Sequence, residues 1–93
     1  MTDRRIVITG IGVISPLGND LASTWEAMKA GRSGIDTIKS MDVTGYSTKI
    51  AGEVKDFDPA PYFKTPKDAR RVDRFTHFAM GAAGMALKDS GLD

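Results

Sequence analysis

The sequence predicts an α/β fold, and three observations lead to this class. Residues 5–9 are β-branched and almost continuously apolar, as in a strand with neighbours on each side and helices above and below. Residues 49–55 have the pattern of a second strand. Residues 74–90 place apolar side chains at helical spacing.

Length and composition exclude several classes of function. The 93 residues allow one domain or part of one, because a typical domain has roughly 100–150 residues. A formal net charge of +1 argues against a general polyanion binder. With no Cys and a single His, the chain offers almost nothing for a metal site, a thiol nucleophile or a His-based catalytic triad. We therefore expect no metal and no cofactor.

The apolar run near the N-terminus is interpreted as a strand and not as a targeting segment. Two arginines followed by residues 6–14 resemble the start of a secretory signal, but the run contains a threonine and two glycines and no small-residue cleavage site follows it. No stretch approaches the roughly 18 apolar residues of a membrane span. We therefore expect a soluble, cytoplasmic protein that does not associate with a membrane.

Turn residues between 16 and 19 end the first strand, and a helix is expected to follow. Asn19 or Asp20 is placed to cap this helix, and Gly31 is placed to stop it. The expected apolar face consists of Leu21, Thr24 or Trp25, and Met28. The large side chains expected to anchor the core or an interface are Trp25, Met28, Tyr62 and Phe63.

The middle of the chain predicts a loop, a strand and a turn, in that order. Residues 33–48 are expected to form a looser segment. Residues 49–55 form the second predicted strand. Residues 56–65 contain Pro59 and Pro61, which predict a turn that includes a single helical turn.

Two helices are expected after this turn. Pro66 suits the first position of a short helix that runs through Arg71. Asp73 can cap the longest helix, residues 74–90, and Gly91 closes it. The expected core-facing stripe of the longest helix consists of Phe75, Phe78, Ala79, Ala82, Met85 and Ala86.

Two features of these elements predict further packing partners. Gly81 and Gly84 lie inside the longest helix and cost up to about 1 kcal/mol each relative to Ala, which predicts close approach of another helix or strand. Two strands alone form only a marginal sheet, and the first would leave its backbone and apolar faces uncovered. We expect either that the chain is the opening section of a larger α/β layer or that it pairs with another copy.

A glycine-rich stretch at Gly10 and Gly12 follows a predicted strand and precedes a predicted helix, which is the arrangement of a dinucleotide-binding loop. The third glycine of that motif is missing, and residues 16–19 separate the strand from the helix. Asp36 lies near the usual distance for a ribose ligand, but its surroundings predict a loop. We favour a plain strand exit over a nucleotide site.

Basic charge is concentrated in residues 64–74, which have a net charge of +3. The cations of this basic stretch are Lys64, Lys67, Arg70, Arg71 and Arg74. The last four align on one helical face if the short helix continues into the long one. Such a face would attract and orient an acidic partner, whereas the alternative is an ordinary solvated helix face. Nucleic acid is not expected, because no aromatic or Gly-rich platform flanks the stretch.

His77 lies beside the apolar stripe of the longest helix. The chain has no second His and no Cys with which it could share a metal or a catalytic role. We therefore expect a structural histidine.

Five segments carry a combined pattern through the whole chain. They are residues 4–19, residues 24–25 with 30–35, residues 51–59, residues 70–75 and residues 86–92. In this order and spacing they resemble the condensing enzymes of fatty-acid synthesis, of the β-ketoacyl-acyl-carrier-protein synthase II type.

The resemblance implies that residues 1–93 are the N-terminal segment of the synthase N-terminal domain, within a thiolase-type, five-layered α/β/α/β/α sandwich. It also implies a homodimeric acyltransferase that elongates acyl chains by decarboxylative Claisen condensation with malonyl-acyl carrier protein. The catalytic Cys-His-His set of the family has no counterpart in this sequence. The resemblance therefore implies catalytic residues beyond Asp93 and no activity of these residues alone.

In this family, basic residues at the start of the long-helix region contact the acidic acyl carrier protein. The resemblance assigns this contact to Lys67, Arg70 and Arg71, with Lys64 and Arg74 as further candidates. Two alternatives stay open. One is a self-standing, non-catalytic module that binds an acidic partner, and the other is a decarboxylase or chain-length-factor relative that lacks the Cys.

Overall fold

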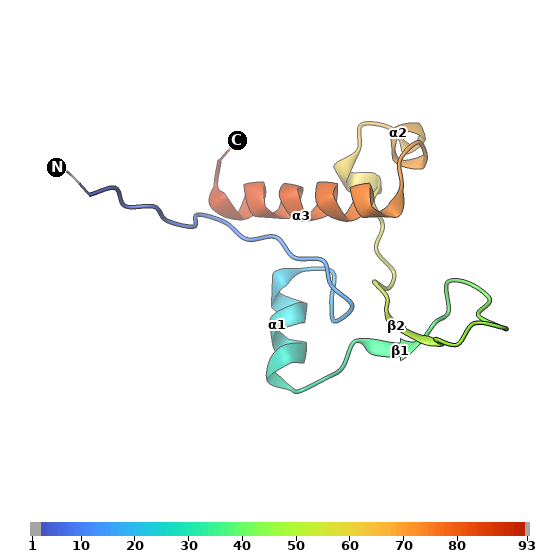
Figure 1. Cartoon of the computed structure of the whole chain (residues 1–93). Helices are drawn as coiled ribbons and strands as arrows, with labels where there is room; N and C mark the ends of the chain where they lie inside the picture. Colours follow the sequence, from blue (N-terminus) through green and yellow to red (C-terminus); the bar gives the residue numbers. More distant parts are fainter. Residues whose placement is uncertain (1–2, 93) are drawn as a thin grey trace.

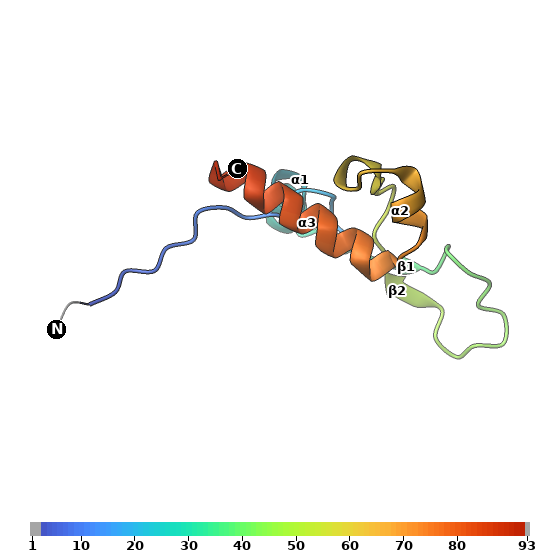
Figure 2. The same ribbon diagram turned by 90° about the horizontal axis from the view of Figure 1, so that it is seen from above.

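The computed structural model describes residues 3–92, which form helices and one short hairpin arranged along an elongated molecule (Figure 1). The elements in chain order are α1 (Leu21–Lys29), β1 (Ile35–Thr37), β2 (Ile50–Gly52), the 3-10 helix η1 (Ala60–Tyr62), α2 (Pro66–Arg70) and α3 (Arg74–Ser90). The radius of gyration is 16.7 Å, whereas a compact domain of this length has about 12 Å. The hairpin loop and the segment before residue 10 extend at opposite ends of the molecule (Figure 2).

Helix α1 begins and ends where the sequence predicts. The Asp20 side chain caps its first turn, since one carboxylate oxygen accepts hydrogen bonds from the Ser23 backbone N–H at 2.8 Å and from its hydroxyl at 2.6 Å. Gly31, with φ of 71°, ends the helix in the left-handed conformation. The expected apolar face is only partly buried. Thr24 and Ala27 are buried, whereas Leu21, Trp25 and Met28 are exposed.

The second predicted strand is present but short, and its partner was not expected. β2 pairs antiparallel with β1, so that Ile35 lies opposite Gly52 and Thr37 lies opposite Ile50. The prediction of a loop around Asp36 is therefore wrong at residues 35–37. Three residues are too few to establish an alternating pattern in the sequence, and it is pairing with β2 that makes them a strand.

The first predicted strand, residues 5–9, is not a strand in this structure. The segment is extended and exposed, with Ile6 at 91% and Ile8 at 83% of full accessibility. A strand needs hydrogen bonds to a neighbour, and the hairpin lies at the other end of the molecule (Figure 1). The β-branched run is thus extended, but within residues 3–92 it has no neighbouring strand with which to form a sheet.

The elements after β2 follow the predicted boundaries. η1 is the single helical turn expected in residues 56–65, and α2 starts at Pro66, where Thr65 Oγ1 accepts a hydrogen bond from the Asp68 N–H at 3.2 Å. α3 covers the predicted range and ends at Gly91, with φ of 75°. Asp73 is the N-cap residue of α3, but its side chain makes no capping hydrogen bond, unlike the expectation.

The two glycines inside α3 permit close packing, but the expected helix or strand is found only at Gly84, where η1 approaches; the segment that approaches Gly81 is neither. A Cβ atom at Gly81 would lie 2.5 Å from Cζ of Phe57, and one at Gly84 would lie 2.7 Å from Cδ1 of Tyr62. The predicted stripe is correct for its later members, because Phe78, Ala82, Met85 and Ala86 are partly buried. It is wrong for Phe75, which is 72% exposed, and for Ala79, which is also exposed, because no segment of residues 3–92 covers that side of the first two turns.

Candidate functional site

The basic residues of the stretch 64–74 lie on separate segments and not on one helix. α2 ends at Arg70, Arg71 is its C-cap, and α3 starts at Arg74 after an intervening turn. The expected alignment of four cations on one continuous helical face is therefore wrong. The chain turns here because Asp73 adopts an extended conformation, with ψ of 165°, which a helix cannot contain.

Four of the five cations are exposed and lie on α2, on its C-cap or just before it, and α2 lies beside the N-terminal end of α3 (Figure 2). Lys64 lies farther along α3, near Gly84. We call these four cations the basic cluster; its members are Lys64, Lys67, Arg70 and Arg71. Within residues 3–92, their side chains make no hydrogen bond or ion pair, and the ion pairs described are Lys29–Glu26 and Lys39–Asp36, in other segments. The basic cluster is thus available to a negatively charged partner.

Arg74, the fifth candidate, is engaged within the chain. One guanidinium nitrogen donates to the Phe57 carbonyl oxygen at 3.0 Å. The guanidinium carbon lies 4.9 Å from the ring centroid of Phe78 and 5.6 Å from that of Phe57, which is the range of a cation–π contact. The spacing of Arg74 and Phe78, four residues apart on one helix, is a signal of this contact that the sequence contained.

His77 has the structural role expected from its sequence context. Its Nε2 lies 2.7 Å from the Ala69 carbonyl oxygen, and its Nδ1 lies 3.2 Å from a guanidinium nitrogen of Arg74. A carbonyl oxygen only accepts and a guanidinium only donates, so these partners assign the neutral tautomer with hydrogen on Nε2. The imidazole also packs edge-on against Phe63, with ring centroids 5.7 Å apart.

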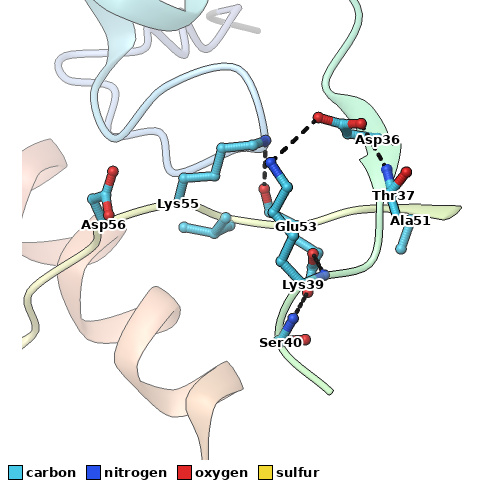
Figure 3. A pocket seen from close by; sticks show the side chains of 9 residues that line it. Asp36, Thr37, Lys39, Ser40, Ala51, Glu53, Lys55 and Asp56 are labelled. Atoms are coloured by element: carbon cyan, nitrogen blue, oxygen red, sulfur yellow. Dashed lines mark hydrogen bonds and ion pairs between the residues drawn. The ribbon is translucent and has the colours of Figure 1, made fainter. Parts of the chain in front are cut away.

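A pocket of about 270 Å³ lies beside the hairpin, and of its charged groups Asp36, Lys39, Glu53 and Lys55 are bound by the chain itself, as Figure 3 shows. Glu53 accepts hydrogen bonds from the backbone N–H groups of Lys39, at 2.8 Å, and of Ser40, at 3.2 Å. Hydrogen bonds from Ser40 and Lys39 hold the pKa of Glu53 below its ordinary value. The hydrogen bonds of Glu53 therefore stabilise the hairpin, and the pocket presents no free pair of carboxylates for acid–base chemistry.

Two further residues connect the same pocket to the segment before α1. The Lys55 ammonium group donates to the carbonyl oxygens of Pro16 and Glu53, both at 3.1 Å. The Asn19 side-chain amide donates to the Lys55 carbonyl oxygen at 2.8 Å. Sequence spacing gave no signal of the contacts with Pro16 and Asn19, because these residues are 36 or more positions from Lys55.

The glycines at positions 10 and 12 serve packing and not nucleotide binding. A Cβ atom at Gly12 would collide with the Ala82 carbonyl oxygen of α3, and one at Gly10 would lie 2.6 Å from the Ser90 nitrogen. The backbone of this segment therefore lies directly on the helix, with no space for a pyrophosphate. The Asp36 carboxylate accepts a hydrogen bond from the Thr37 N–H at 2.7 Å and faces Lys39, and these interactions lower its pKa.

Residues 3–92 lack a metal-binding cluster and a membrane-spanning helix. No group of three or more His, Asp or Glu side chains there could hold a metal ion. In the same part of the chain, no helix combines the length and apolar character needed to cross a membrane.

Comparison with known proteins gives consistent matches over the chain. The family model described as "Beta-ketoacyl synthase, N-terminal domain" matches residues 3–93. Proteins named 3-oxoacyl-(acyl-carrier-protein) synthase 2 are similar, with 47% identity in Vibrio harveyi and 48% in Coxiella burnetii, each over 93 residues and 100% of this chain. The Staphylococcus aureus (strain COL) protein of that name is 47% identical over 91 residues, 98% of this chain.

The matches extend over a minor part of each relative. The chain spans 22% of the length of these three curated relatives. Among solved structures, the ishigamide ketosynthase/chain length factor superposes with a TM-score of 0.86 at 38% identity, covering 99% of this chain and 23% of that one. This likeness supports the α/β class of fold.

Proposed function

Because this chain belongs to the beta-ketoacyl synthase family through residues 3–93, we propose that it is the N-terminal segment of an elongating 3-oxoacyl-acyl-carrier-protein synthase of type II. The relatives of 47–48% identity that carry this name support the assignment. The complete protein would adopt a five-layered α/β/α/β/α fold, act as a homodimer and reside in the cytoplasm. The exposed apolar side chains of residues 6–8 are consistent with cover by further polypeptide.

The reaction of the complete enzyme would be a decarboxylative Claisen condensation between an acyl-enzyme and malonyl-acyl carrier protein. It requires a nucleophilic Cys and His residues that assist loss of CO2. These 93 residues contain no Cys, and the imidazole of the single His is engaged by Ala69 and Arg74. We expect this segment alone to release no ketoacyl product, and product formation by the 93-residue chain would refute the assignment.

The basic cluster is proposed as part of the docking surface for acyl carrier protein. The observation that carries this proposal is that four exposed cations next to α3 have no anionic partner within residues 3–92. Exposed charges of one sign act over a distance and accelerate association with a partner of opposite sign. An acidic carrier protein is such a partner.

The test of docking is charge reversal in the full-length protein. Arg70→Glu with Arg71→Glu should weaken binding of acyl carrier protein by about tenfold or more and should flatten the salt dependence of the association rate. The matched control is Arg32→Glu with Lys88→Glu, which reverses two exposed charges in other segments. Stopped-flow association at several salt concentrations measures both effects. An association rate equal to that of the control would leave the basic cluster as an ordinary solvated surface.

The two alternatives make different predictions. A self-standing module is not favoured, because Ala27, Phe57 and Ala69 are the buried apolar residues of the described chain, which is a small core. A decarboxylase or chain-length-factor relative would have the same N-terminal region, and the likeness to a solved ketosynthase/chain length factor is compatible with the second of these. Sequencing of the coding region beyond codon 93 for a nucleophilic Cys distinguishes this relative from an elongating enzyme.

A further inference from the structure

Most of the basic cluster lies on a helix that is too short to be stable by itself. Three of its four members belong to α2 or its C-cap, and α2 has five residues. An isolated helix of that length is not stable in water, because nucleation costs more than so few hydrogen bonds return. The direction in which the cations project must therefore come from contacts with the rest of the chain.

Those contacts come from the first turn of α3. His77 Nε2 donates to the Ala69 carbonyl oxygen at 2.7 Å, which satisfies a carbonyl at the end of α2 that has no partner within the helix. Arg74 donates to the Phe57 carbonyl oxygen at 3.0 Å, ahead of η1. One turn of one helix thus fixes both ends of the segment 57–69.

The two side chains are also coupled to each other. Arg74 donates to Nδ1 of His77 at 3.2 Å, which selects the tautomer that donates to Ala69. The buried Ala69 and the edge-on Phe63 ring hold the imidazole in place. Because each bond orients a group that makes the next one, the network acts as a unit.

We propose that His77 and Arg74 are positioning residues that pre-orient Arg70 and Arg71 for docking of the acidic carrier protein. The inference rests on the docking function proposed above. Arg70 and Arg71 follow directly after Ala69, so fixing the Ala69 carbonyl fixes the backbone from which both cations project. Pre-orientation reduces the conformational entropy that binding would otherwise cost.

The test separates positioning from general stability in the full-length protein. His77→Leu keeps a side chain of similar size but removes the donor to Ala69, and it should weaken carrier-protein binding by about three- to tenfold. His77→Gln retains an amide donor and should restore most of the affinity. Gly31→Ala is the control, because it strains the end of α1, where Gly31 has φ of 71°, and should lower thermal stability without changing affinity.

A double-mutant cycle gives the readout that a structural role alone would not move. Arg70→Ala should cost less affinity in the His77→Leu background than in the wild type, because an Arg70 that is not oriented already contributes less to carrier-protein binding. If His77→Leu leaves binding unchanged, or if the two losses simply add, the positioning role is overturned while docking stands. If Arg70→Ala with Arg71→Ala leaves wild-type binding unchanged, docking itself fails and the inference with it.

A second variant keeps the proposal testable if His77→Leu does not fold. Arg74→Lys retains the positive charge but cannot maintain both hydrogen bonds of the guanidinium. It should lower affinity while leaving the salt dependence of association unchanged. An equal affinity would overturn the role of Arg74.

Discussion

The two ends of the chain use side chains in opposite ways. Residues 57–90 form three helices, and Arg74 and His77 fix the segment that leads into the longest of them. Residues 3–9 contain a run of β-branched side chains typical of a strand, yet they remain extended and exposed. A helix completes its backbone hydrogen bonds within itself, whereas a strand completes them only with a neighbour. The difference shows that the helices of residues 57–90 complete their backbone hydrogen bonds within this chain, whereas residues 3–9 would need a neighbouring strand to do so.

The largest loss of stability is expected from a substitution in the extended N-terminal segment, because it tests whether this segment is buried in the full-length protein. Ile8→Ala in the full-length protein should lower the free energy of unfolding by about 2–4 kcal/mol, as for a buried aliphatic side chain. Ile8 is 83% exposed in residues 3–92. Chemical denaturation of the two proteins measures the change. A loss below about 0.5 kcal/mol is the value for a surface site and would mean that nothing covers this segment.

A smaller effect is expected at the contact between the two regions. Gly12→Ala places a Cβ atom against the Ala82 carbonyl oxygen of α3, so the segment must move away from the helix. Overpacking of this kind costs about 1–3 kcal/mol. Thermal denaturation of the full-length protein measures the loss, and Gly45→Ala is a control at a glycine with open space around it.

The control at Gly45 carries backbone strain of its own, because its φ is 88°. Any loss from Gly45→Ala reports that strain and not packing, so Gly12→Ala should exceed it. Equal losses at the two positions would show that residues 10–12 do not press on α3 in solution.

The smallest effect concerns pH at the hairpin. Hydrogen bonds from Ser40 and Lys39 lower the folded-state pKa of Glu53 from its ordinary 4.5. A lowered pKa means that Glu53 stabilises the loop above pH 4.5 and that this contribution is lost as the pH falls through the folded-state value. Amide hydrogen exchange at Lys39 and Ser40 should therefore become less protected in acid. Glu53→Gln should remove this pH dependence, and its persistence in that variant would assign the effect to another carboxylate.

The sequence was most informative where structure is local. Capping and stop signals at Asp20, Gly31, Pro66 and Gly91 located the helices, because these residues act on backbone groups a few positions away. Gly81 correctly indicated close packing, although its neighbours Phe57 and Ile14 could not be named from the sequence. The small strand β1 was missed, because it exists only through pairing with β2.

The candidate site was predictable in composition but not in arrangement. Charge alone located the stretch 64–74, but a continuous helical face was wrong because the chain turns before Arg74. The role of Arg74 depends on Phe57, which is 17 residues away in sequence. A contact of that separation follows from tertiary packing and not from any local pattern.

The alternation of glycine and isoleucine along residues 10–12 has a consequence for how this segment could join a sheet. Gly10 and Gly12 both place backbone against α3, while Ile11 between them donates its N–H to the Asp89 carboxylate at 3.0 Å. A slip of one position would turn Ile11 or Val13 toward the helix, where not even a methyl group fits. Packing against α3 therefore fixes which side of residues 10–12 points away from the helix, and with it the register in which this segment could pair with a neighbouring strand.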